Sequence, residues 1–275
     1  MGLYQVFGNE SARLISISAA YEPSLDQAGH LAGPKSELVD RVLRSVDVFA
    51  KDLHDSLEAR NLTDIVDVVF VSDHGMTDTS HPEFIFVDDI LGEGFGMIDH
   101  ADGWPSVGIR FSPKADVPYY LNVLSEAAAA SGGKFDVFTH ETMPERYHFS
   151  HNERIAPIYV VPRVGYALTD RVENGAGMSK GNHGYDNNET SMQAMFVAHG
   201  PFSAVVKAVE QTSSKSILRR WLSGPNQGWH STSNDTYVMD TFQNVEVYNL
   251  MMKLLGLEDL AAPTNGTKGF WNKYF

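Results

Sequence analysis

The stretch Asp64–Val71, DIVDVVFV, and the residues Ser72-Asp73-His74-Gly75-Met76 directly after it decide the fold class. The run is almost continuously apolar, which is typical of a strand buried on both faces of a parallel sheet. It ends in polar residues, and open α/β sheets hold their ligand sites beyond the carboxyl ends of their strands. The stretch therefore predicts a central strand followed by a functional loop.

The residues before this strand predict a βαβ unit. Leu14–Tyr21 is a short β-prone run, and a loop, EPSLDQAGHLAGP, follows it. Ser36–Arg60 then predicts an amphipathic helix, since its apolar residues recur every three or four positions. A strand, a helix and a second strand in this order favour the α/β class.

Further elements repeat this alternation along the chain. We expect a single domain over 1–275, with a mixed polar surface insertion at 202–237 and no linker that would divide the chain. The remaining expected elements are helices at 119–130 and 241–257 and strands at 155–161 and 192–198.

Composition excludes several classes of protein. The 275 residues carry a net charge of −14, from 35 acidic and 21 basic side chains, which argues against nucleic-acid binding. The chain has no cysteine, so a metal would be held by His and carboxylate ligands, as zinc and other first-row divalent ions are. No apolar run reaches the ~18 residues of a membrane span, and the N-terminus lacks the layout of a signal peptide.

Five N-x-S/T sequons lead us to expect a glycoprotein of the secretory pathway, with chance occurrence of this short motif an equal alternative. They begin at Asn9, Asn61, Asn188, Asn234 and Asn265.

Three short stretches concentrate potential metal ligands. They are Asp26-Gln27-Ala28-Gly29-His30, Asp73-His74-Gly75-Met76, and Gly181-Asn182-His183-Gly184-Tyr185-Asp186-Asn187. Each alone is a weak signal, because such residues also make turns and helix caps. Together they offer two carboxylates and three imidazoles, a set that suits two zinc-like ions about 4 Å apart.

The same stretches resemble the type I phosphodiesterase/nucleotide pyrophosphatase family of the alkaline-phosphatase superfamily. The similarity lies in Tyr-x-Pro before D-x-x-G-H-x-x-G-P, then V-S-D-H-G-M, then G-x-H-G-Y-D-N, in that order. It extends over essentially the whole chain except 202–237. Other similar stretches are Gly103-Trp104-Pro105, Met143–Phe149, Ser191–Phe196 and Asn244–Met251.

The resemblance implies an alkaline-phosphatase-like α/β fold, with a central, mostly parallel sheet flanked by helices. It implies two divalent metal ions, zinc first among the candidates. Asp26, His30 and His183 would bind one ion, and Asp73 and His74 would help bind the other. Asp186 is a candidate for orienting His183, and a turn role is equally open.

The resemblance also implies that the nucleophile is a threonine in a P-T-x-T-F-P-N type sequence, together with a further Asp ligand. Neither is found in these 275 residues. We therefore expect the chain to be the C-terminal part of the family's catalytic domain, with no catalytic nucleophile of its own.

The function implied is metal-dependent hydrolysis of phosphodiester or pyrophosphate bonds, with a nucleotide or another small phosphodiester as substrate and a nucleoside monophosphate as product. The implied location is the secretory pathway, as a vacuolar, extracellular or membrane-anchored protein. Two alternatives stay open. One is another esterase of the superfamily, such as a sulfatase or phosphomonoesterase. The other is an inactive fragment or pseudoenzyme that only binds metal.

Overall fold

The computed structural model describes residues 3–10, 13–212 and 236–275, and they fall into two compact units. Unit 1 combines Met1–Glu22, Val48–Asp73 and Ala194–Phe275, and unit 2 combines Pro23–Asp47 and His74–Gln193. The long helix α2 (Glu37–Glu58) contributes residues to both units.

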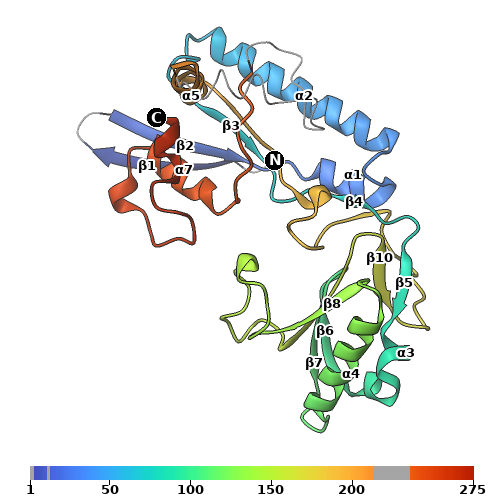
Figure 1. Ribbon diagram of the computed structural model, residues 1–275. Coiled ribbons are helices and arrows are strands. Elements are labelled where there is room, and N and C mark those ends of the chain that lie inside the picture. Colours follow the sequence, from blue (N-terminus) through green and yellow to red (C-terminus); the bar gives the residue numbers. More distant parts are fainter. Residues whose placement is uncertain (1–2, 11–12, 213–235) are drawn as a thin grey trace. The chain divides into compact units, whose positions relative to one another are not determined.

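Unit 2 is built on a four-stranded antiparallel sheet with strand order β6-β7-β9-β8 (Figure 1). Alternate residues of β7 and β9 face the helix α4, so that Ile109 and Ile158 are each 1% exposed and Leu124 of α4 is fully buried. The Asp116 side chain caps α4 by accepting a hydrogen bond from the Tyr119 amide at 3.1 Å. The bounds of these elements are β6 Ile98–Asp102, β7 Val107–Phe111, α4 Val117–Ala130, β8 Phe135–Thr139 and β9 Ile158–Pro162.

Two smaller strand pairs complete unit 2. Strands β5 and β10 pair in parallel, and β4 and β11 pair antiparallel. The remaining elements are α1 Ser24–Ala32, β4 Thr77–Asp78, β5 Glu83–Phe86, α3 Val87–Leu91, η1 Gly92–Met97, η2 Glu145–Tyr147, β10 Tyr166–Thr169, β11 Gly181–Asn182 and η3 Thr190–Met192.

Unit 1 has a core of aromatic and aliphatic side chains centred on Trp271, which is 2% exposed. Phe202 and Val206 of α5 pack there together with Leu250 of α7. The Trp271 indole N–H donates to the carbonyl of Glu246 at 2.7 Å, so its polar atom is also satisfied. The elements are β1 Leu3–Glu10, β2 Arg13–Ala20, β3 Val68–Val71, β12 Phe196–His199, α5 Pro201–Thr212, α7 Glu246–Leu254, η4 Glu258–Leu260 and η5 Phe270–Tyr274.

The α/β class predicted from the sequence is confirmed, but the expectation of a mostly parallel sheet is corrected. Among the described strands, only β5 and β10 run parallel. The central run of the prediction, β3, pairs antiparallel with β12, and its Val71 is 48% exposed. Strand β2 pairs with β1, so β2 and β3 do not form the expected βαβ pair. A short apolar run carries no information on strand direction, and this is why the prediction failed.

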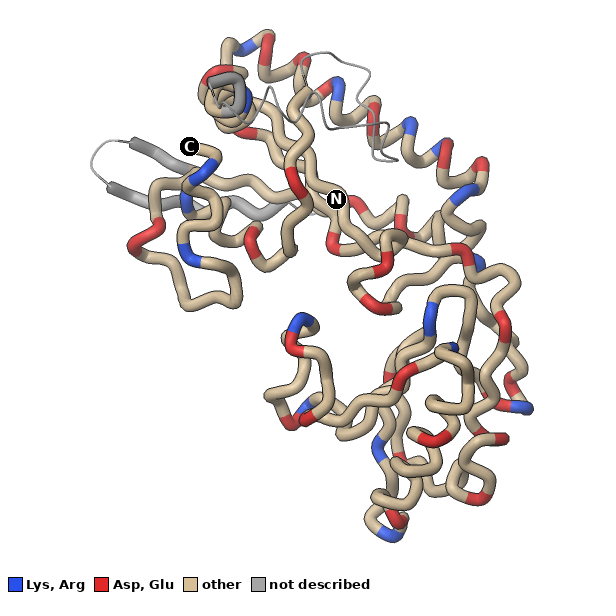
Figure 2. Tube along the Cα trace, in the orientation of Figure 1, with Lys and Arg blue, Asp and Glu red and all other residues tan. Residues whose placement is uncertain are grey.

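The predictions on domain organisation stay untested. Of the expected insertion at 202–237, the part up to Thr212 belongs to α5 and buries Phe202 and Val206, and 213–235 lie outside the described residues. Lys and Arg lie scattered among acidic residues in both units, with no basic stripe over the described part of the chain (Figure 2). No helix among the described residues is both long enough and apolar enough to cross a membrane.

Candidate metal centre

Helix α1 presents Asp26 and His30 on one face. The two residues are four positions apart, and residues at this spacing are neighbours on a helix surface. The helix ends at Gly33, whose φ of +89° suits glycine and whose N–H donates to the Gly29 carbonyl at 2.8 Å. The sequence predicted a loop here, and the structure corrects it to a helix.

Strand β11 brings His183 to the same place. The His30 ring donates from Nδ1 to the carbonyl oxygen of Gly181 at 2.8 Å. Since a carbonyl only accepts, the proton lies on Nδ1 and the lone pair of His30 lies on Nε2. The approach is close, because a Cβ on Gly181 would lie 2.4 Å from the Gly29 carbonyl oxygen. Glycine at 181 therefore allows α1 and β11 to make this contact.

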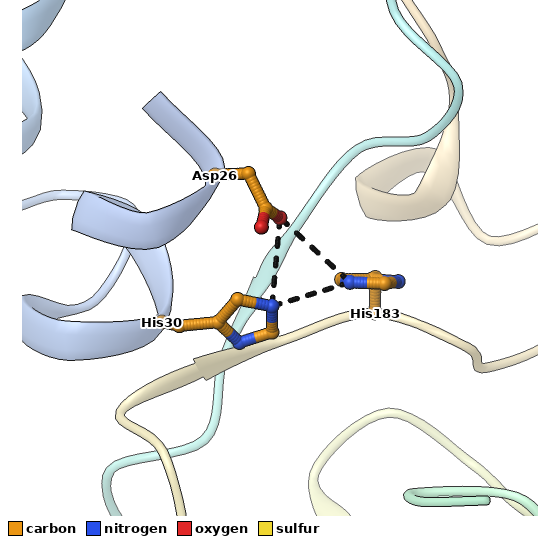
Figure 3. Close-up of side chains that lie close together, drawn as sticks. All are labelled: Asp26, His30 and His183. Atoms are coloured by element: carbon orange, nitrogen blue, oxygen red, sulfur yellow. Dashed lines mark hydrogen bonds and ion pairs between the residues drawn. The ribbon is translucent and has the colours of Figure 1, made fainter. Parts of the chain in front are cut away.

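Asp26, His30 and His183 form a compact triangle of ligand atoms (Figure 3). His30 Nε2 and His183 Nε2 lie 3.2 Å apart. Asp26 Oδ1 lies 3.4 Å from His30 Nε2 and 3.7 Å from His183 Nε2. A tetrahedral zinc ion with bonds of 2.0–2.1 Å needs ligand atoms separated by about 3.3 Å. Asp26 Oδ1 is also buried without a hydrogen bond. The residues thus fit a divalent ion in both spacing and chemistry.

His74 lies against this triangle. Its ring stacks on that of His183, with centroids 3.5 Å apart and planes inclined by 13°. Its Nδ1 donates to the carbonyl of Gly75 at 2.8 Å, which leaves the lone pair on Nε2. Gly75 is needed because a Cβ there would lie 2.2 Å from the Ser191 carbonyl oxygen. His74 therefore lies in ring contact with His183, beside the triangle, and its role as a ligand of a second ion stays a prediction.

Asp73 belongs to unit 1, whereas the other four predicted ligands belong to unit 2. Its backbone carbonyl accepts a hydrogen bond from the Asn244 side chain at 3.0 Å. Its role as a ligand of a second ion stays a prediction.

Asp186 is engaged by an arginine that the motifs did not single out. Arg146 donates to both its carboxylate oxygens, at 2.7 and 2.6 Å, and the Asn188 amide donates at 2.8 Å. Burial on its own raises the pKa of Asp186, but these hydrogen bonds outweigh it and lower the pKa to about 2. Asp186 therefore stays ionised, and its role in orienting His183 stays a prediction. Arg146 lies in the Met143–Phe149 stretch, which was the one available signal for it.

A second group of His and carboxylate side chains lies on α2, in unit 1. It comprises His54, Asp55 and Glu58, whose ligand atoms also lie within 4.8 Å of one another. The His54 ring packs edge-on against His199, with centroids 4.9 Å apart. Asp55 forms an ion pair with Lys51 one turn earlier. The sequence did not single out this group.

Comparisons with known proteins identify relatives across most of the chain. The sequence is 31% identical over 254 residues to an uncharacterized pyrophosphatase/phosphodiesterase of Schizosaccharomyces pombe, covering 90% of this chain and 46% of that protein. It is 30% identical over 255 residues to the bis(5'-adenosyl)-triphosphatase enpp4 of Xenopus laevis, covering 92% of this chain and 47% of that protein. The chain thus spans about half the length of these curated relatives.

The fold has similar solved structures. Murine ectonucleotide pyrophosphatase/phosphodiesterase 5 matches with a TM-score of 0.67 and 27% identity, over 90% of this chain and 55% of that one. An inactive variant of the same murine protein, solved in complex with AMP, matches with a TM-score of 0.66. The sequence model described as type I phosphodiesterase / nucleotide pyrophosphatase matches residues 6–186, and the chain belongs to that family.

Proposed function

We propose that this chain holds divalent metal ions, zinc first among them, for the hydrolysis of phosphodiester or pyrophosphate bonds in nucleotides. The product would be a nucleoside monophosphate, and the role would be nucleotide catabolism. The observation that carries the proposal is the triangle of Asp26, His30 and His183, whose spacing suits one tetrahedral ion.

The relatives support nucleotides as the substrate class. One is named as a bis(5'-adenosyl)-triphosphatase, and one similar structure is a complex with AMP. The bis(5'-adenosyl) triphosphate in that name and AMP both contain a nucleoside joined to phosphate by an ester bond. A net charge of −14 is compatible with anionic substrates only where bound cations reverse the local charge.

Each predicted ligand has a stated task in this proposal. Asp26, His30 and His183 hold one ion, and Asp73 and His74 help to hold the other. When bound, the ions supply Lewis-acid stabilisation of the phosphoryl oxygens and lower the pKa of the attacking oxygen. The Gly181 carbonyl fixes the His30 tautomer, so that Nε2 and not Nδ1 is the ligand atom.

We place the protein in the secretory pathway, as a vacuolar, extracellular or membrane-anchored glycoprotein. Human and yeast relatives are named ectonucleotide pyrophosphatase/phosphodiesterases. Three sequon asparagines, Asn61, Asn188 and Asn265, are exposed, as a glycan requires. Peptide:N-glycosidase treatment of the protein from its native cell should lower its apparent mass.

The test is hydrolysis of a p-nitrophenyl nucleoside monophosphate ester by the purified chain, with zinc added and then chelated. Bound zinc is counted on the same sample, and Asp26→Asn is assayed beside the wild type. The proposal expects zinc binding that chelation and Asp26→Asn both abolish, and no turnover by these 275 residues alone, because none of them matches the threonine nucleophile motif.

The alternatives give different results. Zinc-dependent turnover would contradict the expectation that the chain has no catalytic nucleophile of its own. Preference for p-nitrophenyl phosphate or p-nitrophenyl sulfate over the diester supports another esterase of the superfamily. A folded chain that binds no divalent metal contradicts the proposal.

A further inference from the structure

His183 lies in a segment, 181–188, that is held to the rest of unit 2 at nearly every residue. The Asn182 amide donates to Thr79 Oγ1 at 2.8 Å. The Ser106 hydroxyl donates to the Gly184 carbonyl at 2.5 Å, and the buried Tyr185 hydroxyl donates to the Tyr166 carbonyl at 2.9 Å. These partners come from three separate parts of the chain, so the segment is fixed by tertiary contacts.

The strongest of these contacts is the pairing of Asp186 with Arg146. Arg146, in η2, makes a two-pronged contact with the carboxylate and also donates to Asn187 Oδ1. The Asp186 side chain is only 11% exposed, and the Arg146 guanidinium lies 4.4 Å from the centre of the Tyr147 ring. A two-pronged pair fixes orientation as well as distance, and burial strengthens it.

We propose that Arg146 and Asp186 are positioning residues, which hold the 181–188 segment so that His183 meets Asp26 and His30 at metal-ligand distance before an ion arrives. The inference rests on the proposed function. Asp186 lies three residues from His183, and a flexible segment would have to be ordered at the expense of binding free energy. Because the Arg146–Asp186 pair orders the segment in the metal-free protein, zinc binding does not have to supply the free energy of ordering it.

A single ion pair elsewhere in unit 2 provides a matched control. Arg171 also makes a two-pronged contact with a carboxylate, that of Asp89, but both side chains are more than half exposed. Removing it deletes the same chemistry away from the metal centre.

The experiment compares the wild type with Arg146→Gln, Arg146→Lys, Asp186→Asn and Arg171→Gln. Two quantities are measured for each protein. They are the zinc dissociation constant by competition with a chelator, and amide hydrogen exchange of 181–188 in the metal-free protein. We expect Arg146→Gln and Asp186→Asn to weaken zinc binding by about 10- to 100-fold and to speed exchange in this segment.

Arg146→Lys should give an intermediate effect, because lysine keeps the positive charge but cannot donate to both carboxylate oxygens with the geometry of a guanidinium. Arg171→Gln should leave both quantities unchanged. If Arg146→Gln or Asp186→Asn unfolds the chain, Arg146→Lys and Ser106→Ala, which deletes the neighbouring contact to Gly184, give the same two readings in milder form.

Two results would overturn the proposal. One is unchanged exchange and zinc affinity in the Arg146 and Asp186 variants. The other is a loss of zinc affinity in these variants that Arg171→Gln reproduces, because the effect would then be general destabilisation. A wild type that exchanges slowly at 181–188 but binds no zinc would instead contradict the metal assignment, so the two failures are distinguishable.

Discussion

Two groups of side chains in this protein have the same ligand chemistry and very different construction. The triangle in unit 2 joins Asp26 and His30 with His183, which lies 153 residues after His30, and the group on α2 joins His54, Asp55 and Glu58 from one helix. In the first group a carbonyl fixes a tautomer, a carboxylate oxygen is buried without a hydrogen bond, and a held segment presents the second imidazole. In the second, two of the three side chains are exposed and Lys51 already occupies Asp55.

This contrast predicts that donor atoms alone do not make a metal centre. An exposed carboxylate paired with lysine is already satisfied by its partner and by water, so an ion gains little there. A buried carboxylate oxygen without a hydrogen bond gains more from a new bond to an ion.

Replacement of one triangle ligand should abolish tight zinc binding, whereas replacement of His54 should not. Structural zinc sites contribute on the order of 10–16 kcal/mol, so loss of one of the three triangle ligands is expected to weaken zinc binding by about 100-fold or more. Isothermal titration of His183→Ala and His54→Ala with zinc makes the comparison. Equal losses in the two variants would remove the distinction between the groups.

The close approach of α1 and β11 should not tolerate a methyl group. Gly181→Ala would place a Cβ 2.4 Å from the Gly29 carbonyl oxygen, which should destabilise unit 2 by ~1–3 kcal/mol and displace the carbonyl that holds His30. Gly96→Ala is the control, because nothing lies within 4 Å of its added Cβ. Chemical denaturation and zinc titration should both separate the two variants. If Gly181→Ala binds zinc normally, the His30 contact is not important for the site.

Acid should act on the triangle's supporting segment and not on α2. The pKa of Asp186 is lowered to about 2, so its stabilising contribution is present above about pH 4 and is lost as the pH falls towards 2. The shift corresponds to about 2 kcal/mol, which Asp186→Asn should remove from the difference between pH 5 and pH 2. The hydrogen bond from Lys51 also lowers the pKa of Asp55, but that carboxylate is exposed, and Asp55→Asn should leave the pH profile unchanged. The denaturant midpoints of the wild type, Asp186→Asn and Asp55→Asn, measured between pH 5 and pH 2, test this prediction.

The smallest effect is expected on α2 itself. Lys51→Ala releases Asp55 from its ion pair and should change weak zinc binding by His54 no more than a few-fold, since exposed ion pairs are screened by water. An NMR titration with zinc, which monitors the shift of the His54 ring resonances, measures this change in binding. Tight zinc binding by the α2 group in Lys51→Ala would show that Lys51 alone accounts for the difference in zinc affinity between the two groups.

Much of the candidate site could be predicted from sequence, because its ligands lie in three short motifs with characteristic neighbours. The structure brings Asp26, His30 and His183 together and stacks His74 on His183. Helix α1 was missed because Pro23, Gly29, Gly33 and Pro34 surround the ligands and are typical of loops. The four-residue spacing of Asp26 and His30 was the overlooked sign of a helical turn.

Other features depend on contacts that no local pattern encodes. Arg146 and Asp186 lie 40 residues apart, and each alone resembles an ordinary surface charge. Likewise, the helix over 36–60 was predicted from its periodicity and found as α2, whereas the partner and direction of β3 were not. Periodicity reports which face of an element is apolar, and pairing depends on residues far away in the sequence.

Helix α2 should affect how the purified protein behaves on hydrophobic resins and at high concentration. None of its residues is fully buried, and three apolar residues, Leu43, Val48 and Phe49, are between 42% and 57% exposed. Exposed apolar surface of this kind adheres to hydrophobic resins and to other molecules. The chain should therefore be retained on a phenyl column, and its light scattering should rise with concentration and with added ammonium sulfate.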